Sequence, residues 1–446
     1  MSQTSSTIID GGGDRTAPAS PPRRGTRNEW ILVTFTVATN LADSVTKVAL
    51  PLLAVRITRS PGLVAAVAVL LTLPWLVTAL HVGVFVDRVN RRTMMVGAET
   101  ARLVAIGVLL TAVVADMVSL PLVYATAVTL GIAEVVALTS AASIVPAAVP
   151  RGRWQTVSAR ITAMEYLCNG FLGAPIGGFL VAAGFALALG STGLVYAVGA
   201  VLLLMLVGNF TAGPTRQRRP VHAEIHDGLR FLWRHPLLRT MALLIAGMAA
   251  CWSAWLAIIP TYAVHGPLGL DEREYGFLLT ALGAGGVIGA LAVGPANRLL
   301  GRRWSMFADI IGSFVLVAVP ALMPAGRGAA IAVGVAAFGA GVGGTMWTVN
   351  SRVIIQSAVP GDMLGRFNAA SRLVGWGTAP VAALIAGVLA QTLGYRIAFG
   401  VFAVVSAALV FPYLRTVTTR ALAEVDRIEY AVDQPGQPGR GQRRRR

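Results

Sequence analysis

The sequence predicts an all-α polytopic membrane protein with twelve transmembrane helices in two pseudo-symmetric six-helix halves. Hydrophobic residues make up 55% of the 446 residues and charged residues only 13%, whereas soluble domains carry about 25% charged residues. Long apolar runs recur along the whole chain. The loop chemistry of the first half also returns in the second half, which predicts an internal duplication.

Twelve apolar runs define the predicted helices, and short polar connections separate them. A helix needs roughly 20 apolar residues to cross a bilayer, and each run is close to that length or longer. The runs cover about residues 30–56, 63–86, 93–115, 118–146, 156–183, 188–210, 237–262, 274–297, 304–324, 328–358, 368–391 and 396–415.

The arginines of the connections predict the orientation of the chain. Short cytoplasmic loops are rich in Lys and Arg, and most connecting arginines lie in the even-numbered connections. We therefore expect a multi-pass protein of the cell inner (plasma) membrane with both termini in the cytoplasm. Topology also explains the net charge of +17, so we expect no nucleic-acid partner. The odd-numbered connections carry Arg56, Arg59, Arg273, Arg327 and Arg396.

Polar segments divide the chain into five parts. Residues 1–28 predict a disordered cytoplasmic arm, because they are rich in Gly, Ser, Pro and Arg. The connection 211–236 separates the predicted halves 29–210 and 237–415. Within it, Ile225, Leu229 and Leu232 recur at helical spacing and predict an amphipathic helix on the inner membrane surface. Residues 416–446 predict a basic cytoplasmic tail.

The two halves repeat each other at nearly one offset. Short motifs at equivalent places match at 209 or 210 residues. Parallel repeats of six helices occur in one large class of secondary transporters. The matches are residues 51–55 with 260–264, 87–88 with 297–298, and 149–150 with 359–360.

The connection between the second and third spans resembles the signature turn of the major facilitator superfamily. A degenerate copy follows at residues 297–303, where Asn297 replaces the acid. The resemblance implies a turn that locks the outward-open state, with its acid facing a helix N-terminus of the other half. The predicted conformational gate is Gly83, Asp87, Arg88, Arg91 and Arg92.

Three further stretches indicate a branch of that family. Residues 42–51 and 227–236 resemble bacterial exporters related to siderophore and multidrug efflux proteins, and residues 170–178 are similar to the drug/proton antiporter motif. Ala174 replaces a glycine of that motif, and Glu134 stands where the family has an arginine. The resemblance implies roles in helix packing and kinking for Gly173, Pro175, Gly177 and Gly178.

Four charged residues inside the spans are candidates for proton coupling or substrate binding, because intramembrane charges are costly and default to function. Asp43, Glu134 and Glu165 lie roughly 14–20 Å from the inner helix ends at 1.5 Å per residue. Lys47 is the only lysine. Alternatively, Asp43 and Lys47 neutralise each other at i,i+4, and the glutamates are polar locks between helices. Near the inner face, we expect Glu99 and Arg102 to support the signature turn.

Aromatic and amide residues of the spans are candidates to line a pocket for an aromatic or cationic ligand, or else they pack. No enzyme motif is present, because the glycine-rich runs lie inside spans and lack the P-loop lysine. We therefore expect no enzyme activity, no cofactor and no metal site. The candidates are Asn40, Trp252, Trp255, Tyr262, Trp347, Asn350 and Gln356.

The sequence therefore predicts a monomeric secondary transporter in the lipid bilayer. It exports a small amphipathic compound (a drug, siderophore or secondary metabolite) from the cytoplasm by proton antiport with alternating access. An importer or facilitator of a nutrient is the alternative with the same fold. A non-transporting membrane sensor is the alternative from another class, and the duplicated helix set with its midplane carboxylates argues against it.

Overall fold

The described part of the chain is built from helices and contains no strand. The computed structural model describes residues 23–78, 82, 89–208, 210, 221–360 and 363–424. Within these ranges nine helices are long and apolar enough to cross a membrane, and the number is ten if one bent pair of helices is counted as a single span. Each of the twelve predicted runs contains a described helix. The predicted all-α membrane fold is confirmed, and the observed helices are consistent with twelve spans.

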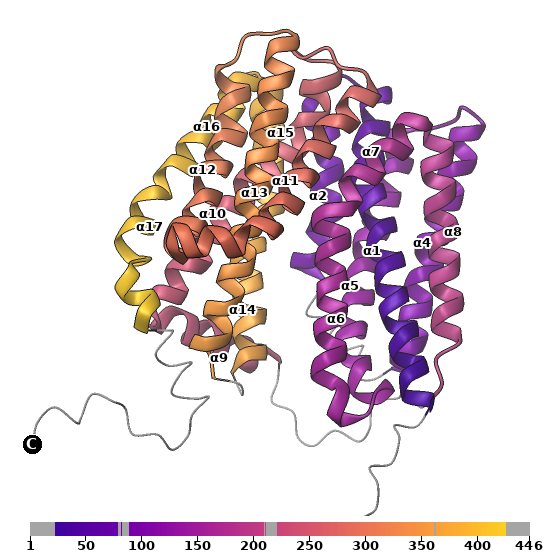
Figure 1. The fold of residues 1–446 in the computed structure, drawn as a ribbon. Helices are drawn as coiled ribbons and strands as arrows, with labels where there is room; N and C mark the ends of the chain where they lie inside the picture. The colour runs from indigo at the N-terminus through magenta and orange to yellow at the C-terminus, as the bar shows by residue number, and fades with distance from the viewer. Residues whose placement is uncertain are drawn as a thin grey trace, which may run out of the picture.

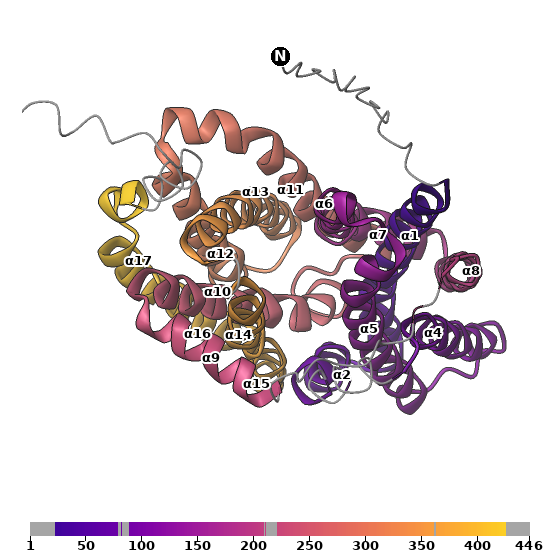
Figure 2. The ribbon, with the colours of Figure 1, turned by 90° about the horizontal axis from the view of Figure 1, so that it is seen from below.

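The first group of helices lies on the right of Figure 1 and forms one bundle in both views (Figures 1 and 2). Its first and fourth long helices, α1 and α5, are central to the candidate site. The elements are α1 (Arg23–Ile57), α2 (Pro61–Val77), α4 (Arg91–Val114), α5 (Leu120–Ala148), the 3₁₀ turn η1 (Arg151–Arg153), α6 (Trp154–Tyr166), the π-helix η2 (Leu167–Leu172), α7 (Gly173–Ala183) and α8 (Phe185–Leu204).

The second group of helices forms the other bundle, on the left of Figure 1. It begins with the helix predicted in the central connection. The elements are α9 (Val221–Arg234), α10 (Pro236–Val264), α11 (Glu272–Leu299), α12 (Gly301–Leu322), α13 (Arg327–Ala358), α14 (Leu364–Trp376), α15 (Thr378–Thr392), α16 (Tyr395–Ala408) and α17 (Val410–Thr416).

Helix α9 packs on α14 through its apolar side. Leu232 is fully buried, and Gly228 lets the two helices approach closely. A Cβ at Gly228 would lie 2.2 Å from the carbonyl oxygen of Arg366, so no larger residue fits without a shift. The helix predicted at 222–233 is therefore present, and its position at a membrane surface stays a prediction.

The ends of the chain depart from the predicted arm and tail. Helix α1 begins at Arg23, and the Asn28 side chain is buried. Its amide donates to the carbonyl oxygens of Ala148 at 3.1 Å and Val207 at 2.9 Å, which anchors this segment in the bundle. At the other end, Leu422 is buried in the core. Asn28 of the predicted arm and Val417 and Leu422 of the predicted tail are therefore buried in the bundle, while residues 1–22 and 425–446 lie outside the described part. The cytoplasmic location of the arm and the tail stays a prediction.

The two groups contact each other toward the face opposite the chain ends. We call the lower face in Figure 1, where α1 begins and α17 ends, the termini face. At the opposite face Arg56 of α1 binds Glu272 of α11 through two hydrogen bonds of 2.5 and 2.6 Å. Nearby, Ser60 donates to Gln391 of α15 at 2.6 Å. These polar contacts join the halves on that side.

Glycine also brings the halves together near the opposite face. A Cβ at Gly178 of α7 would lie 2.8 Å from the Cα of Gly276 on α11, closer than real Cβ atoms approach. Beside this contact, Phe179 and Phe277 stack edge to face with ring centroids 5.9 Å apart. The missing side chains therefore allow backbone contact between α7 and α11.

The fifth predicted span is bent by 42° between α6 and α7. The π-helix η2 lies at the break, and such segments often cause sharp kinks. Pro175 follows in the first turn of α7 and cannot donate a backbone hydrogen bond to the preceding turn. A Cβ at Gly173 would lie 2.1 Å from the Cβ of Ser44, so this glycine permits the contact of α7 with α1.

Candidate functional site

A buried ion cluster joins α1 and α4 in the first half. The guanidinium of Arg102 contacts Asp43 of α1 at 3.0 Å and Glu99 of its own helix at 2.7 Å. The Tyr196 hydroxyl of α8 donates to the second oxygen of Asp43 at 2.8 Å. Thr39 donates to the second oxygen of Glu99 at 2.9 Å. Two carboxyl groups therefore share one arginine.

The composition of this cluster has a chemical consequence. Glu99 and Arg102 are fully buried, and Asp43 is 7% exposed. Transfer of an ion from water to a protein interior costs several kcal/mol, so buried charges persist only when they are paired. Two ionised carboxylates beside one guanidinium leave one negative charge uncompensated. A single bound proton removes that charge, so the cluster is suited to bind and release one proton.

Glu99 and Arg102 belong to the buried ion cluster, and their expected support of the signature turn stays a prediction, because residues 83–88 lie outside the described part. Arg102 binds both Asp43 and Glu99. Glu99 lies eight residues after the start of α4 at Arg91, roughly 12 Å along the helix at 1.5 Å per residue. Because Glu99 and Arg102 are three residues apart, they share one helix face. That face is turned toward α1.

A second ion pair lies close to this cluster and is more exposed. Lys47 Nζ of α1 is 3.0 Å from Glu134 Oε1 of α5. The Lys47 side chain is 43% exposed and the Glu134 side chain 15%. Lys47 thus makes its ion pair across helices and not with Asp43 one turn away.

Arginines of the second half act on the two candidate glutamates. Arg372 of α14 attracts the carboxylates of both Glu134 and Glu165. Arg352 of α13 also attracts Glu165. Both glutamates of the first half therefore feel the positive charge of arginines in the second half. The sequence interpretation missed these partners, although Arg352 lies inside a predicted span, where a charge marks a functional candidate.

Amide side chains tie α1 to the bend in the fifth span. Asn169 of η2 donates to Asn40 Oδ1 at 2.5 Å, and Ser44 donates to Asn169 Oδ1 at 3.0 Å. Asn40 is buried and also donates to the backbone of Thr36. Asn40, a candidate to line a pocket, is engaged in this helix contact in the structure.

Three aromatic candidates of the second half pack in its core. Trp255 is fully buried. Tyr262 is buried, donates to the Pro320 carbonyl oxygen at 3.2 Å, and stacks edge to face on Phe399. Trp347 is buried and belongs to a separate core cluster. These positions fit the packing alternative of the sequence analysis.

The other candidates of the second half lie in three different settings. Asn350 exchanges hydrogen bonds of 2.8 and 3.2 Å with Asn297, the residue that replaces the signature acid. Gln356 is exposed. Trp252 is partly buried, and its indole N–H donates to Ser313 of α12 at 3.0 Å.

Two arginines of the predicted gate contact the end of α8 and the segment that follows it. The Arg92 guanidinium donates to the carbonyl oxygen of Leu204, and the Arg91 backbone N–H donates to Phe210 O at 3.2 Å. In the second half, Arg303 makes the related contact with Leu414 O at 3.2 Å. Cations at helix C-termini are favourable because the unpaired carbonyls carry partial negative charge. The other predicted gate residues, Gly83, Asp87 and Arg88, lie outside the described part.

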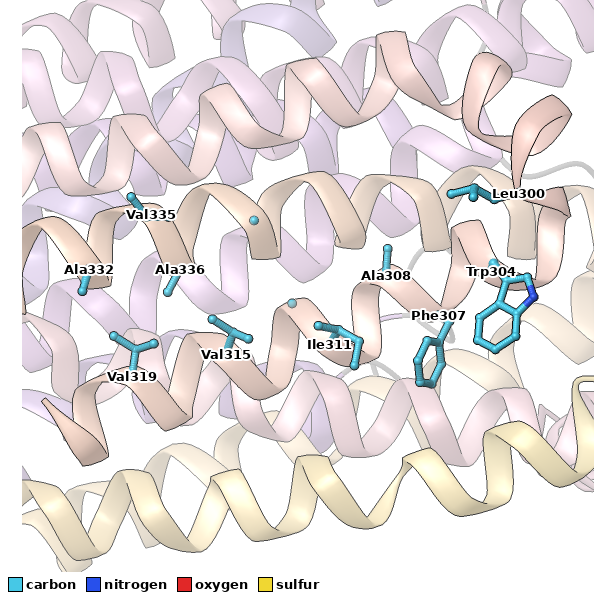
Figure 3. A pocket seen from close by; sticks show the side chains of 12 residues that line it. Leu300, Trp304, Phe307, Ala308, Ile311, Val315, Val319, Ala332, Val335 and Ala336 are labelled. Carbon is cyan, nitrogen blue, oxygen red and sulfur yellow. The ribbon is translucent and has the colours of Figure 1, made fainter.

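An apolar groove runs between α12 and α13 (Figure 3). Its volume is about 740 Å³, and none of the residues lining it is charged. It contains none of the predicted site residues, so it is separate from the ion clusters. Among the described residues, no group of three or more His, Cys, Asp or Glu side chains is placed to hold a metal ion. The groove is lined by Leu300, Trp304, Phe307, Ala308, Ile311, Gly312, Val315, Val319, Ala332, Val335, Ala336 and Gly339.

Solved structures share this fold. A mutant form of the nucleoside transporter NupG superimposes with a TM-score of 0.66 at 11% identity, covering 88% of this chain and 100% of that chain. A bacterial homologue of the iron transporter ferroportin, in an inward-facing state, gives 0.64 at 13% identity, covering 87% and 98%.

Sequence comparisons identify the family and find exporters among the relatives of this chain. The multidrug efflux pump Tap of Mycolicibacterium fortuitum is 25% identical over 388 residues, covering 84% of this chain and 92% of Tap. The enterobactin exporter EntS of Salmonella typhimurium is 25% identical over 292 residues, covering 64% and 67%. A model described as Major Facilitator Superfamily matches residues 32–375 and 263–432. The resemblance seen in the sequence is confirmed, and the chain belongs to the Major Facilitator Superfamily of membrane transporters.

Proposed function

We propose that this transporter exports a small amphipathic compound from the cytoplasm across the cell membrane by proton antiport. One observation carries the proton coupling: Asp43 and Glu99 are buried and share the single guanidinium of Arg102. The direction rests on the relatives, since Tap is a multidrug efflux pump and EntS exports enterobactin. Drugs, siderophores and secondary metabolites are the substrate classes of the proposal.

The cluster couples proton binding to the position of Arg102. When a proton binds Asp43 or Glu99, the guanidinium is held by one carboxylate instead of two. When the proton leaves, the excess negative charge pulls Arg102 back or attracts another cation. A transporter needs such a difference between two states, because a ligand shifts an equilibrium only by its differential affinity for them.

The Lys47–Glu134 pair is the part of the site that we expect to respond to substrate. Lys47 is exposed, and Glu134 is attracted by Arg372 of the other half. A charged or polar substrate that competes for either group changes the contact between the halves. Glu165 is likewise attracted by Arg372 and Arg352 of the other half.

The proposed cycle alternates access between the two faces. The contacts of Arg56 with Glu272 and of Ser60 with Gln391 close the face opposite the termini. With both termini in the cytoplasm, as the arginine distribution predicts, this arrangement is inward-facing. The ion clusters then exchange protons and substrate with the cytoplasm, and the next step opens the closed face.

A vesicle assay tests this function. The purified chain is reconstituted in lipid vesicles, and an imposed pH gradient drives movement of ethidium or enterobactin, with an ionophore that collapses the gradient as the control. We expect gradient-dependent movement of at least one compound opposite to the proton flow. Movement in the same direction as protons would support the importer alternative. No movement of any tested compound under either gradient would contradict proton-driven export of these classes.

A further inference from the structure

The internal repeat aligns the buried ion cluster with a different set of residues in the second half. Helix α4 begins at Arg91 and α12 at Gly301, and α8 begins at Phe185 and α16 at Tyr395. Both pairs are offset by 210 residues. At this offset one of the two acids of the cluster is kept, but the other acid, the arginine and the tyrosine are replaced. The corresponding pairs are Glu99 with Asp309, Arg102 with Gly312, and Tyr196 with Ser406.

Asp309 is therefore a buried acid without a cation. It is 5% exposed, and its described hydrogen-bond partner is the hydroxyl of Ser313 at 3.4 Å. That hydroxyl accepts from the Trp252 indole at 3.0 Å, so its own hydrogen is free to point to the carboxyl. Among the described residues, Asp309 takes part in no ion pair. The titratable group that faces it from the packed helices is the thiol of Cys251 on α10.

Gly344 has no side chain, and the Asp309 carboxyl next to it is therefore flanked by partly exposed residues. Gly344 of α13 stands 210 residues after Glu134. A Cβ at Gly344 would lie 3.7 Å from Asp309 Oδ1 and 3.4 Å from the Trp252 ring. Gly344 and Trp252 are both partly exposed. A side chain at position 344 would stand directly beside the carboxyl, whereas glycine leaves that side uncovered.

We propose that Asp309 is a second proton-binding site, so that each half of the transporter holds one exchangeable proton. This inference rests on the proposed proton-driven transport. A lone carboxylate is strongly disfavoured away from water, whereas the neutral acid with one hydroxyl donor is not. Asp309 therefore holds a proton in the arrangement seen here. The proton returns to water when rearrangement of α10, α12 and α13 exposes the carboxyl, and a proton from the other side refills it.

Infrared difference spectroscopy tests the site directly. The full-length protein in lipid is stepped between acidic and alkaline pH, and the carbonyl stretch of protonated carboxylic acids is recorded. Asp309→Asn is expected to remove one buried-acid band that the wild type shows. Asp116→Asn is the matched control, because Asp116 is exposed in a loop and its replacement should leave this band intact. If Asp309→Asn shows every buried-acid band of the wild type, including any from the Asp43–Glu99 cluster, the proposal is overturned.

A second measurement counts protons. Proton flux and ethidium or enterobactin flux are compared in vesicles, where Asp309→Asn is expected to halve the protons moved per substrate. An unchanged ratio contradicts the proposal. A wild type without gradient-driven flux contradicts the proposed function, while the infrared result still decides the protonation of Asp309. If Asp309→Asn fails to fold, Ser313→Ala replaces it in the spectroscopy. Loss of the hydroxyl donor should then shift the Asp309 band, and an unshifted band would count against the site.

Discussion

Arg102 lies 3.0 Å from Asp43, and this ion pair joins the middle of α4 to the middle of α1. The same guanidinium holds Glu99 at 2.7 Å. Both carboxyl groups thus depend on one cation that is inaccessible to solvent. The Asp43–Arg102 ion pair therefore holds two helices together, and its strength also depends on the protonation of Asp43 and Glu99. The first two predictions separate these roles.

Loss of the shared cation should destabilise the first half. Removal of one partner from a buried ion pair costs about 3–5 kcal/mol, because the other charge stays buried and uncompensated. We expect Arg102→Met to lower the thermal unfolding temperature of the purified protein. Adding Asp43→Asn and Glu99→Gln removes the orphaned charges and should restore most of the loss. A triple variant as unstable as Arg102→Met would contradict this electrostatic explanation.

Neutralising the acids should uncouple transport from the proton gradient. Asp43→Asn, Glu134→Gln and Glu165→Gln each remove a carboxylate that faces an arginine or lysine. We expect Asp43→Asn to lose most of its gradient-driven flux, because an amide cannot bind and release the proton that the carboxyl carries. Glu424→Gln, at an exposed position, is the control. Full gradient-driven flux in all three variants would rule out the proton assignment.

Breaking the contact of Arg56 with Glu272 should favour opening of the face opposite the termini. The pair is partly exposed, and such pairs contribute about 0.2–1 kcal/mol, which changes an equilibrium at most about fivefold. Spin labels at Arg59 and Arg273 report the distance across this face. Glu272→Arg should increase the population with a long distance, and the swap Arg56→Glu with Glu272→Arg should restore the original distribution. An identical distribution in all forms would show that the pair does not hold the face closed.

A methyl group at Gly178 should block closure of the same face. The added Cβ would lie 2.8 Å from the Cα of Gly276, where only backbone movement makes room. We expect Gly178→Ala to reduce turnover in vesicles while the protein still folds. Gly107→Ala is the matched control, because a Cβ there meets nothing within 4 Å. Equal transport by the two variants would mean that close contact of α7 and α11 is not needed for the cycle.

The signature acid should affect turnover more than binding. The sequence predicts that Asp87 gates the cycle without contact to substrate, whereas its counterpart Asn297 binds Asn350 inside its own half. We expect Asp87→Asn to cut the transport rate while ethidium or enterobactin binding to the purified protein is retained. Wild-type rates in this variant would exclude the gating role, and lost binding would indicate substrate contact.

Hydropathy was enough to predict the helices, and the repeated motifs with the polar connection 211–236 predicted their grouping into halves. Each apolar run became helical because a chain in lipid must satisfy its own backbone hydrogen bonds. Local signals also located α9, whose Leu232 is buried on α14. The arm and tail were less predictable, since the polar Asn28 is held by distant carbonyl oxygens. The composition of a short segment does not reveal such partners.

The membrane class, the repeat and the family could be read from the amino-acid order, because these depend on span length and on motifs that are local in the chain. The same order marked Asp43, Lys47, Glu134 and Glu165 as charges inside spans. The packing of the helices determined which charged side chains form ion pairs. That packing fixed the rotation of α4, which turns Arg102 to Asp43, 59 residues away, and it left Asp309 without a cation. Such pairings depend on how small and large side chains pack the helices against one another. The hydropathy of a single helix carries no information about which residues of a neighbouring helix it will contact.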